Sequence, residues 1–565
     1  MRLYHSRFLV WPLLALALLL AACASPQSNP GLVQVTVEAD GKSLAVQVAA
    51  GSSVQQALAA AGLSLGSLDR SDPPIYSRVS AGQSVRLVRV TEKFEVTREP
   101  VPFENQVLYN ESLPEGKDHE VYIQEGKNGL REVVVRHVYE DGVEVSSSQV
   151  KSTVIEQPVA AIWMKGIQRP FAPVTVPGRL VYLRDGNAWM IEATTGNRRA
   201  VVTTGDLDGY IFSLSDDGSW LLFTRKAKTD GQINTLWAAR IGDPKTDGTP
   251  ASLIDLRIKN VIYFAEWLPG SNAQAAFSTV EPQVAAPGWR TNNDLRNVTI
   301  FKSRETYSST VQLKENLGGV YPWWGISFAW ANDALRLAYA NDHAVGILDV
   351  EPGKNNSLQE KGLSAWLQFA PLKTYSDWAW VPGVSWGPDG KMLYSVSHFA
   401  PAGMVLPEES QLFDLSAIPL EGGAALPLAA DVGMFAYPLA SPRQTQPSGE
   451  QGYQVAYLQA ALPHESATSH YQVCVMDRDG SNKRGLFPEA GVVGLNPQRE
   501  WGQWSPAPLP GSDHWAIATI YEGNLWLVDA SAGSPGCQPG QSPANEKIQA
   551  WQITGDGQTT RVAWK

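Results

Sequence analysis

The sequence predicts a mainly β protein, in which a small β-grasp-like domain and a thin β-sheet domain precede a seven-bladed, or six-bladed, β-propeller. Three observations lead to this fold class. Alternating apolar and polar residues flank a short helical segment in residues 33–91. Glycines punctuate strand-rich segments in residues 92–168. Beyond residue 178, an apolar strand ending before a turn recurs every 53 to 65 residues.

The N-terminus is typical of an export signal. Arg2 and Arg7 flank the start of an apolar run, Phe8 to Leu20, which is too short to serve comfortably as a membrane span. Leu20-Ala21-Ala22-Cys23 resembles the lipobox of bacterial lipoproteins. The resemblance implies that residues 1–23 are a signal, that Cys23 is lipidated, and that the protein is extracytoplasmic and anchored to a membrane. The alternative is an ordinary secretory signal with Cys23 as a chance thiol.

Composition limits the partners and the kind of fold. The net charge of −11 and the pI near 5.4, without a cluster of basic residues, argue against nucleic acid or an anionic membrane surface as a partner. A chain of 565 residues is too long for one hydrophobic core. Besides Cys23 there are only Cys474 and Cys537, which excludes a disulfide scaffold and a cysteine zinc site. Whether these two pair is left open by the sequence.

After a polar tether at residues 24–32, the first domain is expected at 33–91. Val33–Ala39 and Leu44–Val48 alternate around an Asp-Gly turn, and Val54–Ala61 reads as a short capped helix. A last alternating strand follows in the same segment. A hairpin, one helix and a returning strand form a β-grasp-like arrangement. It resembles the ubiquitin-like domain found in resuscitation-promoting factors and related wall proteins.

Residues 92–168 are expected to form a thin sheet without a core. The segment opens with Glu95-Val-Thr-Arg-Glu-Pro-Val-Pro-Phe103, and its strands are separated by glycines. These glycines, expected to supply positive φ at strand ends, are Gly116, Gly126, Gly129, Gly142 and Gly166. The pattern resembles the G-five domain. That family implies binding to cell-wall glycan and surface adhesion. In resuscitation-promoting factors the same two domains precede a wall-cleaving domain; a different module follows in this chain, so hydrolysis is not inherited.

After a linker at 169–177, residues 178–565 carry the repeat. Its strand endings before turns are Leu214, Trp267, Trp330, Trp386, Leu439, Trp504 and Trp564. A short apolar strand follows the turn, as at Trp220–Thr224, and a third strand comes after it. Sheets of this size at this spacing are propeller blades.

The two ends of the repeat predict how the ring closes. Trp564 ends a first strand with nothing after it, whereas the segment from Gly178 begins with a second strand. Pairing these two fragments completes a seventh blade and removes exposed sheet edges. The Trp-x-Pro-Asp-Gly turns resemble the TolB-like propeller repeat. That family often has six blades, so the predicted count departs from it.

Aromatic residues are the candidate ligand-binding groups, because several precede the repeated strands and could face the mouth of a central channel. They are Tyr210, Tyr321, Trp323, Trp324, Trp378, Trp380, Tyr437 and Trp501. Such side chains can stack on sugars or peptides. The competing interpretation is packing between blades, which is expected for about two-thirds of them because most buried aromatics fill volume.

Other motifs are interpreted as structural. Ser385 lies in a G-x-S-x-G sequence, but no helix follows it as a nucleophile elbow requires. His464 and His470 lack the helical spacing of a zinc motif, and His119 and His137 have no supporting ligand spacing. We therefore expect no catalytic residues, no metal and no cofactor.

The sequence thus favours a non-catalytic surface lipoprotein. Its N-terminal domains are expected to bind wall glycan, and its propeller to bind an envelope protein or a glycan. One alternative is an enzyme that processes wall polysaccharide or peptide in the propeller channel, because propellers host such sites and fold alone does not decide. Another is a structural spacer in an envelope assembly.

Overall fold

The structure is a computed structural model that describes most of the chain. The described residues are 31–110, 120–166, 171–242, 252–300, 309–313, 325–353, 358–376, 378–445, 451–489, 492–537 and 549–565. The predicted signal, tether and lipidation site at Cys23 lie outside them. No helix in the described part of the chain is long and apolar enough to cross a bilayer.

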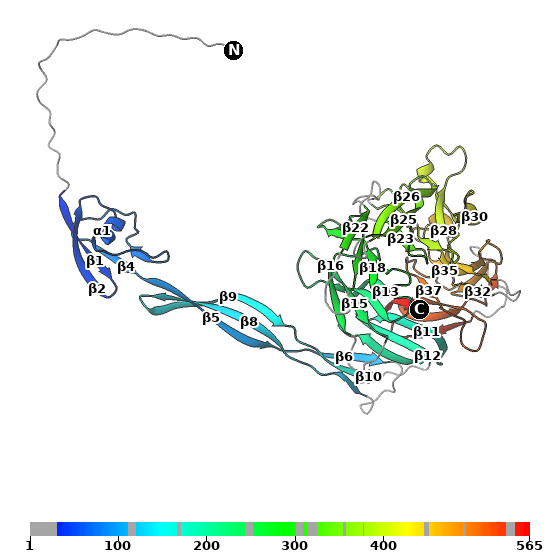
Figure 1. Ribbon diagram of the computed structural model, residues 1–565, viewed down its shortest axis with the longest axis horizontal. Coiled ribbons are helices and arrows are strands. Elements are labelled where there is room, and N and C mark those ends of the chain that lie inside the picture. The colour runs from blue at the N-terminus through cyan, green and yellow to red at the C-terminus, as the bar shows by residue number, and fades with distance from the viewer. Residues whose placement is uncertain are drawn as a thin grey trace, which may run out of the picture. The chain divides into compact units, whose positions relative to one another are not determined.

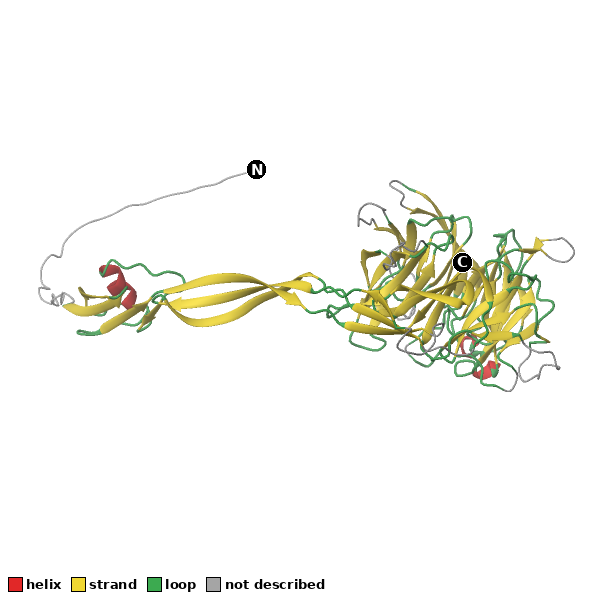
Figure 2. Cartoon of the chain, turned by 90° about the horizontal axis from the view of Figure 1, so that it is seen from below, coloured by secondary structure: helices red, strands yellow, loops and turns green. Residues whose placement is uncertain are grey.

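The chain divides into two compact units. The first contains residues 1–104 and 126–161, and the second contains residues 105–125 and 162–565. Strands dominate the described residues of both units, and the one α-helix among these residues lies in the first unit (Figure 2). Part of the segment expected as a thin sheet therefore belongs to the second unit.

A small mixed sheet with one helix begins the first unit (Figure 1). Its strands, in spatial order, are β2 (Lys42–Ala49), β1 (Leu32–Ala39), β4 (Ser84–Val88) and β3 (Arg70–Asp72). The helix α1 (Val54–Ala60) starts at a capping box formed by Ser53 and Gln56. Leu58 of α1 is fully buried with Val35 and Val37 of β1. The parallel pairing of β1 with β4 completes the predicted β-grasp arrangement.

A long three-stranded antiparallel sheet follows almost directly (Figure 1). It consists of β5 (Val90–Val101), β8 (Gly129–Glu140) and β9 (Val143–Glu156). Every residue of β9 is exposed, so this sheet has no core on that side, as the sequence predicts. Arg89, between β4 and β5, contacts Asp69 at 2.7 Å and Asp40 at 2.9 Å. These contacts tie the start of the long sheet to the helix-bearing domain.

The glycines of this region do not all act as the sequence suggests. Gly142, in the turn between β8 and β9, has φ +84°. Gly126 and Gly129 do not have positive φ. A Cβ at Gly126 would lie 2.3 Å from the ring of Phe103, and one at Gly129 would lie 2.4 Å from the carbonyl oxygen of Glu156. Their role is close approach, and positive φ is needed only at Gly142 among these three.

The second unit begins with a small sheet and continues into the propeller. The small sheet contains β6 (Asn105–Asn110), β10 (Ala161–Gly166) and β7 (Val121–Gln124). Arg184 donates a hydrogen bond of 2.5 Å to the carbonyl of Tyr109 and also pairs with Asp556. The small sheet thereby contacts the propeller within the same unit.

Apart from two short two-stranded hairpins, the described strands from residue 175 onward fall into seven sheets, each given from its first strand outward. They are β42 (Thr559–Trp564), β11 (Thr175–Arg184), β12 (Asn187–Val202); β13 (Leu207–Leu214), β14 (Trp220–Lys226), β15 (Asn234–Arg240), β16 (Leu253–Lys259); β17 (Ala265–Trp267), β18 (Gln274–Phe277), β21 (Leu295–Thr299), β22 (Ser309–Leu313); β23 (Ser327–Trp330), β24 (Arg336–Ala340), β25 (Ala344–Pro352), β26 (Leu358–Gln368); β27 (Val384–Trp386), β28 (Met392–Phe399), β29 (Leu412–Pro419), β30 (Leu426–Ala429); β31 (Leu439–Ala440), β34 (Gln454–Ala460), β35 (Tyr471–Asp477), β36 (Arg484–Phe487), β40 (Ser534–Pro535); and β37 (Gly502–Trp504), β38 (Ala516–Tyr521), β39 (Asn524–Asp529), β41 (Ala550–Gln552).

Consecutive sheets pack against each other, and the last packs against the first. Contacts between first strands, such as β13 with β17 and β23 with β27, place these strands at the centre. The contact of β37 with β42 returns the arrangement to its start. Separate hydrophobic clusters fill the spaces between neighbouring sheets; one joins Leu222 of β14 to Phe277 of β18. Two short hairpins, β19 (Val280–Pro282) with β20 (Trp289–Thr291) and β32 (Gln444–Thr445) with β33 (Gln451–Gly452), project from this framework.

The predicted joining of distant chain segments is present. β42 pairs antiparallel with β11, with Val562 opposite Tyr182. Both side chains are buried, at 3% and 0% exposure. The indole N–H of Trp564 donates a hydrogen bond of 2.7 Å to the carbonyl of Pro177. Residues almost four hundred positions apart thus form one sheet. The number of blades stays a prediction.

A repeated turn follows the first strand of several sheets. An aspartate side chain in the turn accepts a hydrogen bond from the backbone N–H two residues later, in the pairs Asp217–Ser219, Asp333–Leu335 and Asp389–Lys391. The residue after each aspartate has positive φ: Gly218 (+64°), Ala334 (+56°) and Gly390 (+71°). The Asp-Gly of the sequence motif is therefore a turn signal. Ala334 is the one of these three residues that is not a glycine, although its backbone conformation favours glycine.

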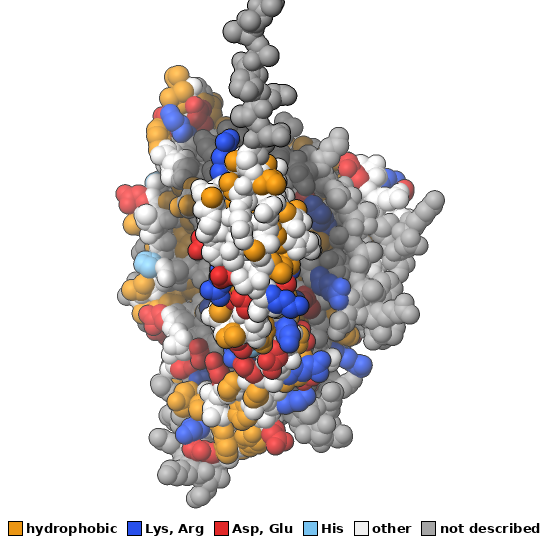
Figure 3. Space-filling model, turned by 90° about the vertical axis from the view of Figure 1, so that its left-hand side faces the viewer, with side chains coloured by type: hydrophobic (Ala, Val, Ile, Leu, Met, Phe, Trp, Pro, Cys, Tyr) orange, Lys and Arg blue, Asp and Glu red, His pale blue; other side chains and the backbone are white. Residues whose placement is uncertain are grey.

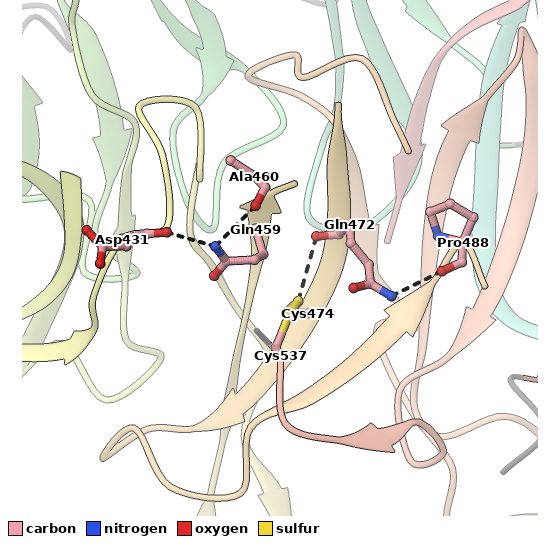
Figure 4. Close-up of a disulfide and its surroundings, with 7 residues drawn as sticks. All are labelled: Asp431, Gln459, Ala460, Gln472, Cys474, Pro488 and Cys537. Atoms are coloured by element: carbon pink, nitrogen blue, oxygen red, sulfur yellow. Dashed lines mark hydrogen bonds between the residues drawn. A yellow bond between two sulfur atoms is a disulfide. The ribbon is translucent and has the colours of Figure 1, made fainter. Parts of the chain in front are cut away.

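Two cysteines form a disulfide in the propeller (Figure 4). Cys474 lies on β35, and Cys537 follows β40; their Cα atoms are 6.1 Å apart and both residues are buried. Nearby, the amide of Gln472 donates a hydrogen bond of 3.1 Å to the carbonyl of Pro488. The bond closes a loop with a sequence separation of 63, which corresponds to about 4 kcal/mol of stabilisation in a chain-entropy model. It fastens the segment after β39 to the neighbouring sheet.

Candidate ligand-binding channel

The first strands of several sheets line a cavity of about 240 Å³ within the propeller. Its walls come from β13, β17, β23, β37 and β42, together with the turn residues that follow them. This volume is below the roughly 300–1,000 Å³ of pockets that hold drug-sized ligands. The cavity therefore suits a ligand the size of one sugar ring or one amino acid.

The tryptophan that ends a first strand has a repeated structural role. In four sheets its indole N–H donates a hydrogen bond to a main-chain carbonyl at or near the junction with another strand. These bonds are Trp267 to Ser213 (3.1 Å), Trp386 to Ala329 (2.8 Å), Trp504 to Leu439 (2.9 Å) and Trp564 to Pro177 (2.7 Å). In three of them the acceptor belongs to the first strand of the preceding sheet. The tryptophan repeat in the sequence thus reflects bonding between sheets as well as packing.

Trp330 departs from this pattern. It is 8% exposed and lines the cavity, yet its indole N–H has no hydrogen-bond partner among the described residues. By its position in the repeat, its acceptor would be the main-chain carbonyl of Glu266. A buried donor without a partner costs roughly 1–3 kcal/mol. Such a group is unusual enough in a folded protein to require an explanation.

Charged side chains gather in the same cavity. Glu266 and Glu500 both line it, and within the described residues no hydrogen bond or ion pair engages either carboxylate. Asp216 forms an ion pair of 2.9 Å with Lys565. Burial raises the pKa of Glu266 to about 7; Lys565 opposes the rise, and Glu500 and Asp216 add to it. A carboxyl with such a pKa is unusual outside functional sites.

Aromatic residues lie around one part of the channel. Tyr210 and Trp289 meet edge to face, with ring centroids 6.0 Å apart. The indole N–H of Trp289 donates a hydrogen bond of 2.8 Å to the hydroxyl of Tyr263. Burial raises the pKa of both tyrosines, Tyr210 and Tyr263. Trp289 comes from the hairpin of β19 and β20, so an insertion in one sheet completes this cluster.

The predicted aromatic residues have different positions in the structure. Tyr210, 36% exposed, lines the cavity. Trp380 and Trp501 are 1% and 4% exposed and donate their indole N–H groups to main-chain carbonyls, so both act as packing residues. Tyr437 is half-buried, and burial raises its pKa to about 12. Trp378 is also half-buried and packs against the core of the fifth and sixth sheets. Tyr321, Trp323 and Trp324 lie outside the described residues.

The charged cavity residues were not predicted from the sequence. Glu266 does carry one signal, because it precedes Trp267 on a first strand where other repeats have Ser213, Ala329 or Ser385. A charge on a central strand must face the channel or be buried. Glu500 and Trp289 lie outside the repeated motif, and the sequence offers no pattern that would assign them to the site.

The motifs that were interpreted as structural lie in ordinary elements. Ser385 is in the middle of β27, and its hydroxyl accepts a hydrogen bond of 3.0 Å from the backbone N–H of Ala440. His464 lies in the short 3-10 helix η4 (Pro463–Glu465), and His470 follows in the loop. Within the described residues no group of three His, Cys, Asp or Glu side chains is placed to hold a metal ion. His119 lies outside those residues.

His137 has partners that the sequence did not indicate. It lies on β8 between two other strands, with Nδ1 2.9 Å from Glu144 on β9 and Nε2 3.3 Å from Glu95 on β5. The hydrogen bond to Glu144 and the charges of both glutamates raise its pKa.

On the face shown in Figure 3, Lys and Arg side chains are interspersed with Asp and Glu and do not gather into one basic patch.

Comparison with known protein families identifies the two N-terminal domains. The G5-linked ubiquitin-like domain matches residues 35–74, and the G5 domain matches residues 92–168. A crystal structure of HP0197-G5 is 31% identical to this chain, covering 14% of it and 99% of that structure, with a TM-score of 0.13. No curated protein sequence matches the chain.

Solved structures similar to the propeller include enzymes at low identity. A putative 6-phosphogluconolactonase from Bacteroides uniformis is 9% identical, with 67% of this chain and 98% of that structure covered and a TM-score of 0.36. An oligogalacturonate lyase in complex with manganese is 12% identical, with 59% and 79% covered and a TM-score of 0.36. The resemblance to the TolB-like repeat stays a prediction. The chain therefore carries a G5-linked ubiquitin-like domain, a G5 domain and a mainly β, propeller-like region after them.

Proposed function

We propose that this protein is a non-catalytic, lipid-anchored surface protein that binds cell-wall glycan through its N-terminal domains and a protein or glycan partner through its propeller. The G5 match over residues 92–168 carries the proposal, because G5 domains are associated with binding of cell-wall components. The long sheet of β5, β8 and β9 supports it, since every residue of β9 is exposed and available to an extended polymer.

A binding experiment with purified wall sacculi tests this assignment. Residues 33–168 and residues 169–565 are incubated separately with insoluble sacculi and sedimented. We expect the first fragment to be retained and to be released by soluble wall oligosaccharides. Failure of the first fragment to sediment would remove the wall-binding part of the proposal. Circular dichroism of each fragment confirms that it has kept its β structure.

Lipid anchoring is tested at Cys23. In the Cys23→Ser variant no thiol is present at the lipobox position, so the protein should move from the membrane fraction to the soluble fraction and lose incorporation of labelled fatty acid. Cys474→Ser leaves the lipobox unchanged and is the matched control, which should stay in the membrane fraction. Labelled fatty acid in the Cys23→Ser variant would contradict the anchor.

An enzyme is the second candidate, because Glu266 has a pKa of about 7 and shares a cavity with Glu500. A carboxyl that titrates near neutrality suits general acid–base catalysis. On this alternative, Glu266→Gln would abolish release of soluble fragments from wall polysaccharide or peptide while binding of the same material persists. If neither the wild type nor the variant releases fragments, the non-catalytic assignment is retained.

A further inference from the structure

Several polar groups that line the cavity have no hydrogen-bond or ion-pair partner among the described residues. Glu266, which is half-buried, and Glu500, which is exposed, carry carboxylates without a hydrogen-bond or ion-pair partner, and the buried indole N–H of Trp330 has no acceptor among the described residues. The buried Nε of Arg561, which also lines the cavity, is a second donor without an acceptor. Buried donors such as those of Trp330 and Arg561 are normally satisfied by protein or by bound molecules. A ligand that pairs with these groups must carry hydrogen-bond donors for the carboxylates and an acceptor for the N–H groups.

The balance of charge in the cavity specifies the donor. Lys565 is occupied by Asp216 at 2.9 Å, and Nη1 of Arg561 donates to Gln498 at 3.1 Å and to the carbonyl of Thr560 at 2.8 Å. The two glutamates are left as the acceptors with capacity to spare. Carboxylates bind a cationic donor more strongly than a neutral one, because charge-assisted hydrogen bonds are about twice as strong.

The remaining surface of the cavity limits the ligand's size and shape. Trp267 and Phe212 contribute to the wall. The volume of about 240 Å³ limits the ligand to one small molecule. We propose that this cavity binds a small ligand that carries an ammonium group close to an oxygen acceptor, the chemistry shared by amino sugars and free amino acids. The ammonium contacts Glu266 and Glu500, and the oxygen accepts from Trp330.

This inference rests on the proposed binding role of the propeller and names the chemistry of its site. Isothermal titration of residues 24–565, the chain without its predicted signal and lipidated cysteine, uses four probes: glucosamine, lysine, N-acetylglucosamine and glucose. We expect glucosamine or lysine to bind, and N-acetylglucosamine and glucose, which lack an ammonium group, to bind at least tenfold more weakly. Preference for glucosamine identifies an amino sugar as the source, and preference for lysine identifies an amino acid.

Variants connect binding to the named groups. Glu266→Gln and Trp330→Phe should each weaken the preferred probe at least fivefold. Trp386→Phe is the matched control, because that tryptophan already donates to Ala329. It should lower the thermal unfolding temperature and leave probe affinity within twofold. Trp330→Phe loses no protein hydrogen bond, so its unfolding temperature should not fall as that of Trp386→Phe does.

The outcomes separate this inference from the proposed function. Binding of neither amine, equal binding of N-acetylglucosamine, or full affinity in Glu266→Gln and Trp330→Phe would each overturn it. Sedimentation of residues 33–168 with wall sacculi tests the N-terminal domains without the cavity. Loss of amine binding with retained sedimentation would therefore overturn the ligand assignment alone, whereas loss of sedimentation alone would overturn wall attachment.

Discussion

Glu266 makes stability depend on pH in a direction opposite to that of most carboxyls. Its pKa is raised from 4.5 to about 7 by burial, so the folded protein holds this proton more tightly than the unfolded chain does. The group costs almost nothing at pH 4, costs progressively more as the pH rises from 4.5 to about 7, and reaches its full cost above that value. The ionised carboxylate of Glu266 therefore lowers the unfolding free energy of the protein at neutral and alkaline pH.

Replacing this carboxyl tests the sign. The Glu266→Gln variant should match the wild type in unfolding free energy at pH 4 and exceed it at pH 8, by up to about 3 kcal/mol. Urea denaturation at the two pH values measures the difference. A variant that is less stable than the wild type at pH 8 would show that the carboxylate has a stabilising partner in the folded protein.

Ala334 adopts a backbone conformation that suits glycine. Its φ of +56° matches Gly218 and Gly390 in the equivalent turns. The left-handed region costs a residue with a Cβ about 1–2 kcal/mol, part of which glycine loses again through the entropy of the unfolded chain. Ala334→Gly should therefore raise the unfolding free energy by about 0.5–1 kcal/mol in urea. Gly390→Ala is the reverse substitution and should lower it; a stabilising effect there would refute the turn argument.

At this scale the sequence predicted the turn but not the cavity. The aspartates and glycines of the turn act through neighbouring residues, so their roles can be seen in a short motif. Glu266, Glu500 and Trp330 line one cavity only after β17, β23 and the turn before β37 are brought together. The sequence could not distinguish Trp330 from the equivalent tryptophans. All have the same side chain, and only the structure shows that the indole N–H of Trp330 has no carbonyl acceptor in the described part of the chain.

At the scale of elements, the three-stranded sheet of β5, β8 and β9 depends on cross-strand pairs because it lacks a core on the β9 side. His137 of β8 bridges Glu95 and Glu144 on the two flanking strands. Its raised pKa means that the folded protein binds this proton more tightly than the unfolded chain. The stabilisation is fully present below the unfolded pKa near 6.5 and is lost as the pH rises through the higher folded value.

The pH response of this sheet gives a measurable result. The unfolding temperature of the first unit should fall as the pH is raised from 6 to 9, and the fall should be smaller in His137→Gln, which keeps a polar side chain without the titrating charge. Calorimetry of the whole chain follows this transition. NMR titration of His137 checks the direction of the shift independently: a pKa below 6.5 would contradict the proposed bridge.

Strands were easier to predict than the reasons for individual glycines. The second strand expected at Trp220–Thr224 is present as β14, because alternation and turn residues are local signals. Gly126 and Gly129 were expected to provide positive φ, but they avoid clashes with Phe103 and Glu156. Those neighbours are brought in by pairing between distant segments, which no local pattern contains.

At the scale of the whole propeller, stability should depend on the strand that joins the end of the repeat to its beginning. Val562 is 3% exposed in β42, whereas Thr560 on the same strand is exposed. Val562→Asp places an unpaired charge in the core and should lower the unfolding free energy by about 3–5 kcal/mol. Thr560→Asp should change it by less than about 0.5 kcal/mol. Chemical denaturation compares the two, and similar small effects would mean that β42 contributes little.

The pairing of β11 with β42 also constrains the order of folding. Trp564 and Pro177 are separated by 387 positions, so the first sheet has an unpaired edge during the synthesis of nearly the whole propeller. Contacts of such long sequence separation form late and slowly. Until β42 pairs with it, the exposed edge of β11 can accept a strand from another molecule, and folding helpers would have their greatest effect during that interval.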